Sequence, residues 1–121
     1  MAVQDDLLLA AMWRADDFYF DAMAQVRMSS WSAGRVTLLG DAGYCPSPLS
    51  GQGTSLALVG AYVLAEALDG TDGDRRRGFE LYETRMREFV TLNQALATEN
   101  PGGPPSEESA ERAKFAVRLD A

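Results

Sequence analysis

The spacing of apolar residues divides the N-terminal part of the chain into three segments. Residues 5–14 carry apolar side chains at helical spacing behind a capping aspartate, Asp5 or Asp6, and predict a short helix. From residue 18 to residue 28 every even position is apolar. This period of two predicts a half-buried strand over residues 18–28, and residues 29–34 predict a turn.

The pattern changes after the turn. Residues 35–40 form a short run of β-branched and leucine residues, which predicts a fully buried strand. Residues 54–68 are apolar on nearly every side and predict a helix buried between layers. Residues 75–97 have one apolar face and predict another helix. Residues 100–105 form a Pro- and Gly-rich linker, and residues 106–121 hold a terminal helix that starts at a capping serine.

Together these segments predict an α/β fold with two strands, about four helices and an incomplete sheet. Trp13, Trp31 and the aromatic cluster at residues 18–20 are the candidate core aromatics. Gln25 and Arg27 fall on the polar face of the predicted strand. They could line a substrate cavity, or they could face solvent or another domain.

Composition narrows the class of protein. The formal net charge is −7, so nucleic acid and anionic membranes are not expected as partners. A single cysteine, Cys45, allows no intrachain disulfide, and no signal peptide is evident, which favours a reducing cytoplasmic location. The chain has no histidine, which excludes a Ser-His-Asp triad and a histidine-ligated metal site, and no metal ligand set is predicted.

One motif carries the candidate chemistry. The predicted strand ends in Gly40-Asp41, a Pro/Ser loop follows, and Gly51-Gln52-Gly53-Thr54 opens the long helix. The first turn of a helix offers unpaired N–H groups and a positive dipole end, and flanking glycines allow a ligand to approach the backbone. Asp41 could accept hydrogen bonds from ligand hydroxyls, or it could simply cap the loop. Pro48 could contact a ligand or only stiffen the loop.

The run from Gly34 through Ala42, with Pro48, Gly51 and Gly53, resembles the second FAD-binding motif of the flavin-dependent aromatic hydroxylases, the 4-hydroxybenzoate hydroxylase-like monooxygenases. In this family the motif's aspartate binds FAD hydroxyls, the proline loop passes beside the isoalloxazine ring, and the helix N-terminus faces its pyrimidine edge. The resemblance implies the following FAD-binding residues: Gly40, Asp41, Pro48, Gly51, Gln52, Gly53 and Thr54. It implies no catalytic side chain. Gly43 and Tyr44 stand where family members usually have Ala and His.

The resemblance also implies a role. Family enzymes use NAD(P)H and FAD to hydroxylate aromatic or polyketide-type substrates, and reduced flavin supplies the oxygen chemistry. They begin with a Gly-x-Gly-x-x-Gly turn and carry a mid-chain Asp-Gly motif; the Gly-x-Gly-x-x-Gly pattern does not occur in this sequence. It is therefore expected to correspond to the C-terminal segment of an FAD/NAD(P)-binding Rossmann-like fold, to bind FAD weakly or not at all alone, and to be inactive without a complementing N-terminal flavoprotein piece.

On this interpretation residues 1–33 are a remnant of the substrate domain, with its helix and strand. Residues 34–99 are the FAD-binding strand, loop and helices, followed by the linker and the terminal helix. Unpaired edges on strand 18–28 and the apolar helix 54–68 favour a homo-oligomer. The alternative hypothesis is a non-catalytic interaction or regulatory module that retains the flavoprotein fold.

Overall fold

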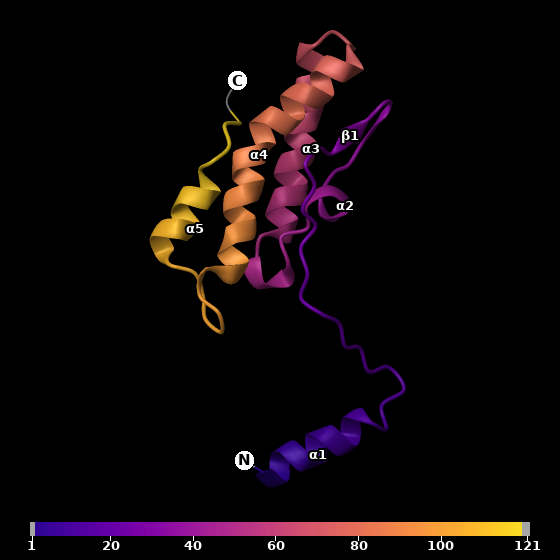
Figure 1. The fold of residues 1–121 in the computed structure, drawn as a ribbon, viewed down its shortest axis with the longest axis vertical. Coiled ribbons are helices and arrows are strands. Elements are labelled where there is room, and N and C mark those ends of the chain that lie inside the picture. Colours follow the sequence, from indigo (N-terminus) through magenta and orange to yellow (C-terminus); the bar gives the residue numbers. More distant parts are fainter. Residues whose placement is uncertain (1, 120–121) are drawn as a thin grey trace.

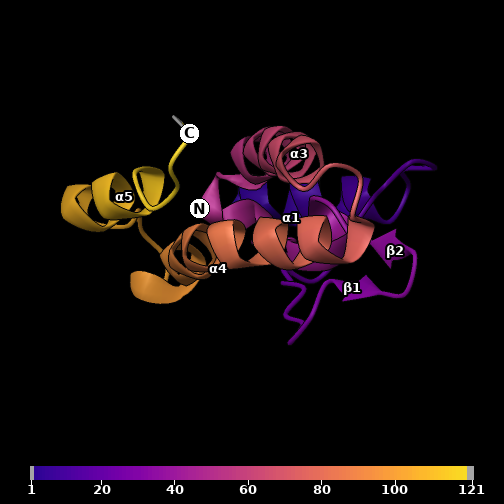
Figure 2. The same cartoon turned by 90° about the horizontal axis from the view of Figure 1, so that it is seen from above.

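The computed structural model describes residues 2–119 and is mainly helical. In chain order its elements are α1 (Ala2–Met12), β1 (Ser32–Ala33), β2 (Val36–Thr37), α2 (Asp41–Tyr44), a 3₁₀ turn (Pro48–Ser50), α3 (Gly53–Gly70), α4 (Arg75–Glu99) and α5 (Glu107–Lys114). α4 is the central element, with α3 on one side and α5 on the other (Figure 1, Figure 2). α1 lies well apart from this body (Figure 1). No helix within the described residues is long and apolar enough to cross a membrane.

α3 and α4 form a helical hairpin that contains most of the core. Asp74 begins α4 by accepting a hydrogen bond from the Arg77 N–H at 3.2 Å, so the basic run 75–77 forms the first helical turn. The buried core side chains of the two helices are Leu56, Val63, Ala67, Tyr82, Met86, Phe89 and Val90. The hydrophobic effect of burying these side chains holds the two helices together.

The prediction that helix 54–68 is buried between layers is wrong. Its buried positions recur at helical spacing on the face toward α4, while Leu58 is 68% exposed and Tyr62 50% exposed on the other face. Apolar residues on several faces of a helix therefore show that other elements could pack against those faces, not that they do so. Among the described residues only one side is covered.

The prediction of a strand over residues 18–28 is also wrong. This segment has no regular structure, and every residue from 13 to 24 is exposed. Its only ladder-like backbone contact within the described residues is the Val26 N–H donating to the Cys45 carbonyl at 3.0 Å. A segment with apolar residues at every second position forms a strand only where a neighbouring strand pairs with its backbone. No such strand lies beside residues 18–28 within residues 2–119.

The predicted buried strand 35–40 is reduced to a hairpin arm. Val36 and Thr37 pair antiparallel with Ala33 and Ser32, and Gly34 makes the turn with φ of 57°. Val36 is 62% exposed. The two observed strands thus pair with each other in one small antiparallel hairpin.

The ends of the chain differ from expectation as well. α1 starts at Ala2, so Asp5 lies in its first turn and is not the cap. α5 ends at Lys114, shorter than predicted, and residues 120–121 of the predicted terminal helix lie outside the described residues. Ser106 caps α5 as predicted, because its hydroxyl accepts from the Ser109 N–H at 3.1 Å.

Candidate functional site

Gly40 joins the β-hairpin to α2 in a conformation that favours glycine. Its φ is 67° and its carbonyl accepts hydrogen bonds from the N–H groups of Gly43 and Tyr44. A Cβ at Gly40 would lie 3.3 Å from Ala57 Cβ, so the missing side chain lets the turn pack on α3. Asp41 follows as the first residue of α2 and is exposed.

The loop between α2 and α3 is held by its own short-range hydrogen bonds. The Ser50 hydroxyl donates to the Ser47 carbonyl and accepts from the Gln52 N–H, each at 3.1 Å. Ser47 has φ of 72°, a positive value that is uncommon outside glycine, and Gly51 closes the turn at φ of 69°. Pro48 is exposed at the start of the 3₁₀ turn. The loop is therefore hydrogen-bonded within itself, with Ser47 and Ser50 buried and Pro48 exposed.

The loop brings Asp41 next to the N-terminus of α3. A Cβ on Gly53 would lie 3.9 Å from Asp41 Oδ1, so the carboxylate and the helix start are neighbours. Within residues 2–119 no acceptor is bonded to the N–H groups of Gly53, Thr54 and Ser55, and Gln52 provides no side-chain cap. The site thus joins a carboxylate acceptor to a row of backbone donors at a positive helix end.

These residues fit the group that the sequence predicts. A Cβ at Gly51 would meet nothing within 4 Å, so the backbone at the helix entrance is open to a ligand. The carboxylate can accept from sugar-type hydroxyls, and the helix N-terminus can donate to an electron-rich ring edge. No group of three or more potential metal ligands occurs in the described residues.

A pair of buried tyrosines, which sequence reasoning did not single out, supports this site from beneath. The Tyr44 and Tyr82 hydroxyls are 2.8 Å apart, and the Tyr82 hydroxyl donates to the Leu38 carbonyl at 3.0 Å. Burial and the neighbouring hydroxyl raise the pKa of Tyr82. A Cβ at Gly60 would overlap the Tyr44 hydroxyl, so this glycine makes room for the pair. The pair fixes both ends of the turn that carries Asp41.

Two glutamine side chains hold the extended segment 25–28 against the body. Gln25 Nε2 donates to the carbonyls of Pro46 and Gln94 at 2.9 and 2.7 Å. Gln94 Nε2 donates in turn to the Val26 carbonyl at 2.7 Å. Gln25 was predicted to line a substrate cavity or to face solvent or another domain. Its side chain instead replaces the missing sheet partners of this segment.

Comparison with known proteins identifies proteins that are similar to this chain. No protein-family model matches the chain. An uncharacterized protein of Mycobacterium tuberculosis (strain ATCC 25618 / H37Rv) is 56% identical over 99 residues, which cover 81% of this chain and 27% of that protein. A flavin-dependent monooxygenase of Legionella longbeachae is 55% identical over 87 residues, 72% of this chain and 22% of that protein. An FAD-dependent monooxygenase of Sarocladium schorii is 44% identical over 99 residues, 82% of this chain and 23% of that protein.

Solved structures agree with the sequence relatives. The crystal structure of tetracycline destructase Tet(55) matches 96% of this chain and 35% of its own chain, with a TM-score of 0.81 and 44% identity. That of tetracycline destructase Tet(51) has a TM-score of 0.73 at 37% identity. The chain spans about a quarter of the length of the curated relatives it matches, from 22% to 27% for those named above. The chain is thus homologous to a portion of proteins named flavin-dependent monooxygenases.

Proposed function

We propose that this chain is the FAD-binding part of an NAD(P)H-dependent flavin monooxygenase of the 4-hydroxybenzoate hydroxylase-like group, acting on an aromatic or polyketide-type substrate. One observation carries the proposal. The Asp41 carboxylate lies beside the unbonded N–H groups at the start of α3, in a chain homologous to flavin-dependent monooxygenases.

Each site residue then has a physical role. Asp41 accepts hydrogen bonds from ribityl or ribose hydroxyls of FAD, and Gly40 sets the position of Asp41. The backbone from Gly51 to Thr54, including Gln52 and Gly53, donates to the pyrimidine edge of the flavin, where preorganised donors stabilise negative charge. Pro48 stiffens the loop beside the ring. When bound, FAD supplies the redox and oxygen chemistry, and the chain supplies binding and orientation.

The proposal includes a complementing flavoprotein piece. The chain lacks the Gly-x-Gly-x-x-Gly pattern and matches only 35% of the Tet(55) chain. Leu58 and Tyr62 on α3 are exposed, so an apolar face is available for another polypeptide to cover. We expect weak or no FAD binding by the chain alone. Homo-oligomer formation remains a prediction, now with α3 as its interface, because strand 18–28 is not formed.

Equilibrium dialysis tests the proposal directly. FAD is dialysed against the chain alone, against the part of Tet(55) outside the match, and against their mixture. We expect firm FAD retention and NAD(P)H-dependent oxygen consumption only in the mixture. Nanomolar FAD binding by the chain alone would contradict the need for a second piece. A mixture that forms a complex but retains no more FAD than its parts would contradict the flavin-binding role.

A second candidate function is a non-catalytic interaction module. The observation that favours it is the exposed aromatic segment before the body, in which Trp13, Tyr19 and Phe20 are each more than 80% exposed. Large exposed apolar side chains in one segment are typical of protein contact sites. In the dialysis experiment this function predicts a complex without flavin.

A further inference from the structure

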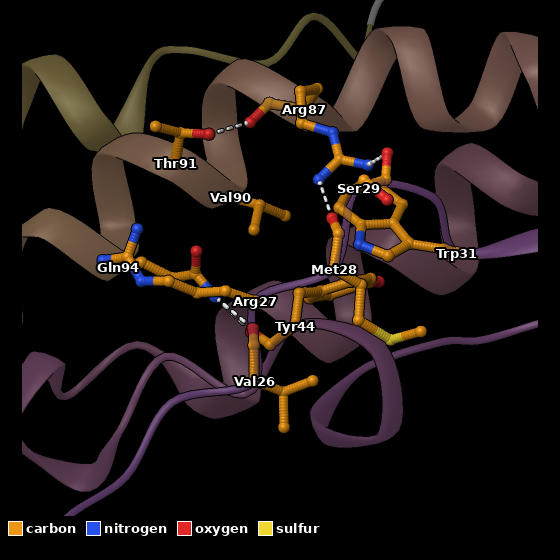
Figure 3. Close-up of a pocket in the computed structure, with 10 residues that line it drawn as sticks. All are labelled: Val26, Arg27, Met28, Ser29, Trp31, Tyr44, Arg87, Val90, Thr91 and Gln94. Atoms are coloured by element: carbon orange, nitrogen blue, oxygen red, sulfur yellow. Dashed lines mark hydrogen bonds between the residues drawn. The ribbon is translucent and has the colours of Figure 1, made fainter.

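A pocket of about 270 Å³ lies between the extended segment 26–29 and α4, with Trp31 and Tyr44 on its remaining side (Figure 3). None of the seven residues predicted to bind FAD lines this pocket. Residues 27–29 in its wall are exposed, so the pocket can be reached from outside the body. A group bound in it would therefore be something other than the flavin.

Trp31 brings an unsatisfied hydrogen-bond donor to this pocket. The residue is 2% exposed, and its Nε1 is the one buried side-chain polar atom without a partner in the described part of the chain. Figure 3 shows this nitrogen at one end of the pocket, below the Arg87 guanidinium, whose carbon lies 4.0 Å from the indole ring centre. An indole N–H can only donate, and leaving it buried without an acceptor costs free energy. This end of the pocket therefore has a place for one acceptor atom.

The charges at this end of the pocket balance. The Arg87 guanidinium pairs with Glu83 and donates to the Met28 carbonyl at 2.8 Å. The Arg27 guanidinium lies at the opposite end of the pocket (Figure 3). Because no unpaired charge lies beside Trp31 Nε1, a neutral acceptor suits this donor better than a carboxylate does. The peptide carbonyl is the neutral acceptor that every polypeptide segment offers.

The surroundings of the pocket favour a polypeptide as the source of this acceptor. The wall formed by residues 26–29 follows closely on residues 13–24, which are all exposed and have apolar side chains at every second position from residue 18. The match with Tet(55) covers only 35% of that chain. Polypeptide that packed against residues 18–24 would lie beside the pocket, because the two segments are nearly continuous.

We propose, on the basis of the complementing flavoprotein piece in the proposed function, that Trp31 Nε1 donates a hydrogen bond to a main-chain carbonyl of that piece. An extended segment of the piece enters the pocket from the side of residues 27–29. The indole N–H has no acceptor in the chain alone, so association removes the cost of leaving it unpaired. Trp31 is thus a core residue that also belongs to the interface.

Replacement of Trp31 by benzothienylalanine isolates this hydrogen bond, because the two-ring shape remains and sulfur takes the place of the N–H group. The chain alone should be as stable after the replacement as before, since its indole N–H has no acceptor to lose. Its affinity for the complementary part of Tet(55), measured without FAD by isothermal titration calorimetry, should fall about fivefold, the equivalent of one neutral hydrogen bond. The same replacement at Trp13, which is 82% exposed, is the matched control. It should leave the affinity nearly unchanged, because an exposed N–H already bonds to water.

The indole N–H signal of Trp31 in a ¹H–¹⁵N NMR spectrum gives a second measurement. The spectrum of the chain with benzothienylalanine at this position lacks the signal and so identifies it. In the parent chain, formation of the complex should move the proton signal downfield, as the gain of an acceptor does.

Three results would overturn the proposal. The replacement of Trp31 could leave the affinity unchanged, which would mean that its N–H bonds to water in both states. The indole signal could fail to move downfield in the complex, or the two pieces could fail to associate. Association with the downfield shift but without retention of added FAD would support this hydrogen bond and contradict the flavin-binding role alone.

Discussion

Trp13 and Trp31, the two tryptophans of the chain, lie in opposite environments. Trp13 is 82% exposed in the segment that follows α1, and Trp31 is 2% exposed against Tyr44, at 4.6 Å between ring centres. Both segments are rich in apolar residues, yet only the second has α3 and α4 to pack against. An apolar side chain contributes to stability only where another element removes it from water. The comparison thus separates a body, residues 24–119, from an N-terminal segment, residues 2–23.

The largest expected effect tests this comparison directly. Trp31→Ala should lower the free energy of unfolding by about 3–5 kcal/mol, because it opens a cavity and removes the ring over which Arg87 lies. Trp13→Ala is the matched control and should change it by no more than about 0.5 kcal/mol. Urea unfolding followed by circular dichroism measures both. Equal losses for the two variants would abolish the distinction between body and N-terminal segment.

A second pair of variants sharpens the account within α3. Gly60→Ala would place a methyl group on the Tyr44 hydroxyl and 3.0 Å from Leu39 Cδ1, and should cost about 1–3 kcal/mol. Gly70→Ala is at the C-terminal end of α3, where the new methyl group meets nothing within 4 Å, and it should be neutral or slightly stabilising. Thermal unfolding should give a lower melting temperature for Gly60→Ala than for Gly70→Ala. The reverse order would mean that Tyr44 is not held against Gly60.

The tyrosine pair gives the body a pH dependence. Tyr82→Phe should cost about 1–2 kcal/mol, because the Leu38 carbonyl and the Tyr44 hydroxyl each lose a partner. Since burial raises the pKa of Tyr82, the folded protein keeps a proton that the unfolded chain loses near its ordinary pKa of about 10. The free energy of unfolding should therefore fall as pH rises above about 10.

Denaturant unfolding at a series of alkaline pH values checks this prediction. The slope should be smaller in Tyr82→Phe than in the parent, whereas Tyr19→Phe in the exposed N-terminal segment should retain nearly the parental slope. A parental slope in the Tyr82→Phe variant would show that this hydroxyl is not the group that titrates.

The smallest effect concerns a partly exposed ion pair between α3 and α4. Arg85 Nη2 lies 2.9 Å from Glu66 Oε2, and the two side chains are 22% and 26% exposed. Glu66→Gln should lower the free energy of unfolding by about 0.2–1 kcal/mol, and less at high salt. Glu80→Gln on the exposed side of α4 is the control and should have no measurable effect. A loss of unfolding free energy above about 1 kcal/mol would contradict the account of this pair as a weak, solvent-screened one.

The sequence predicted the helices themselves better than the contacts that each segment makes with the rest of the protein. Capping residues such as Ser106, and the glycines at the two ends of α3, act within a few residues of their own position, so the limits of α3 and α4 and the start of α5 could largely be predicted. The period-two pattern of residues 18–28 could not indicate whether a partner strand is present. For the same reason, apolarity on several sides of α3 could not show that only one side is covered.

The candidate site likewise has a part that the sequence predicted and a part that it did not. The order of Gly40, Asp41 and Gly53 predicted a carboxylate and a helix N-terminus in one motif, and the structure brings them together. The Tyr44–Tyr82 pair and the Gln25–Gln94 contacts join residues far apart in the sequence, so no spacing rule could find them. Gly60, a glycine inside an apolar helix, was the one available signal of a close approach.

Flavin retention by an Asp41 variant tests the central claim most directly. In the mixture of this chain with the complementary part of Tet(55), Asp41→Asn should weaken FAD retention by about tenfold or more, because a hydrogen bond to a charged acceptor contributes roughly 1.5–3 kcal/mol. Asp69→Asn, near the opposite end of α3, makes the same chemical change away from the site and should retain FAD as the parent does. Equal retention by the parent and both variants would contradict the role of Asp41 in binding FAD.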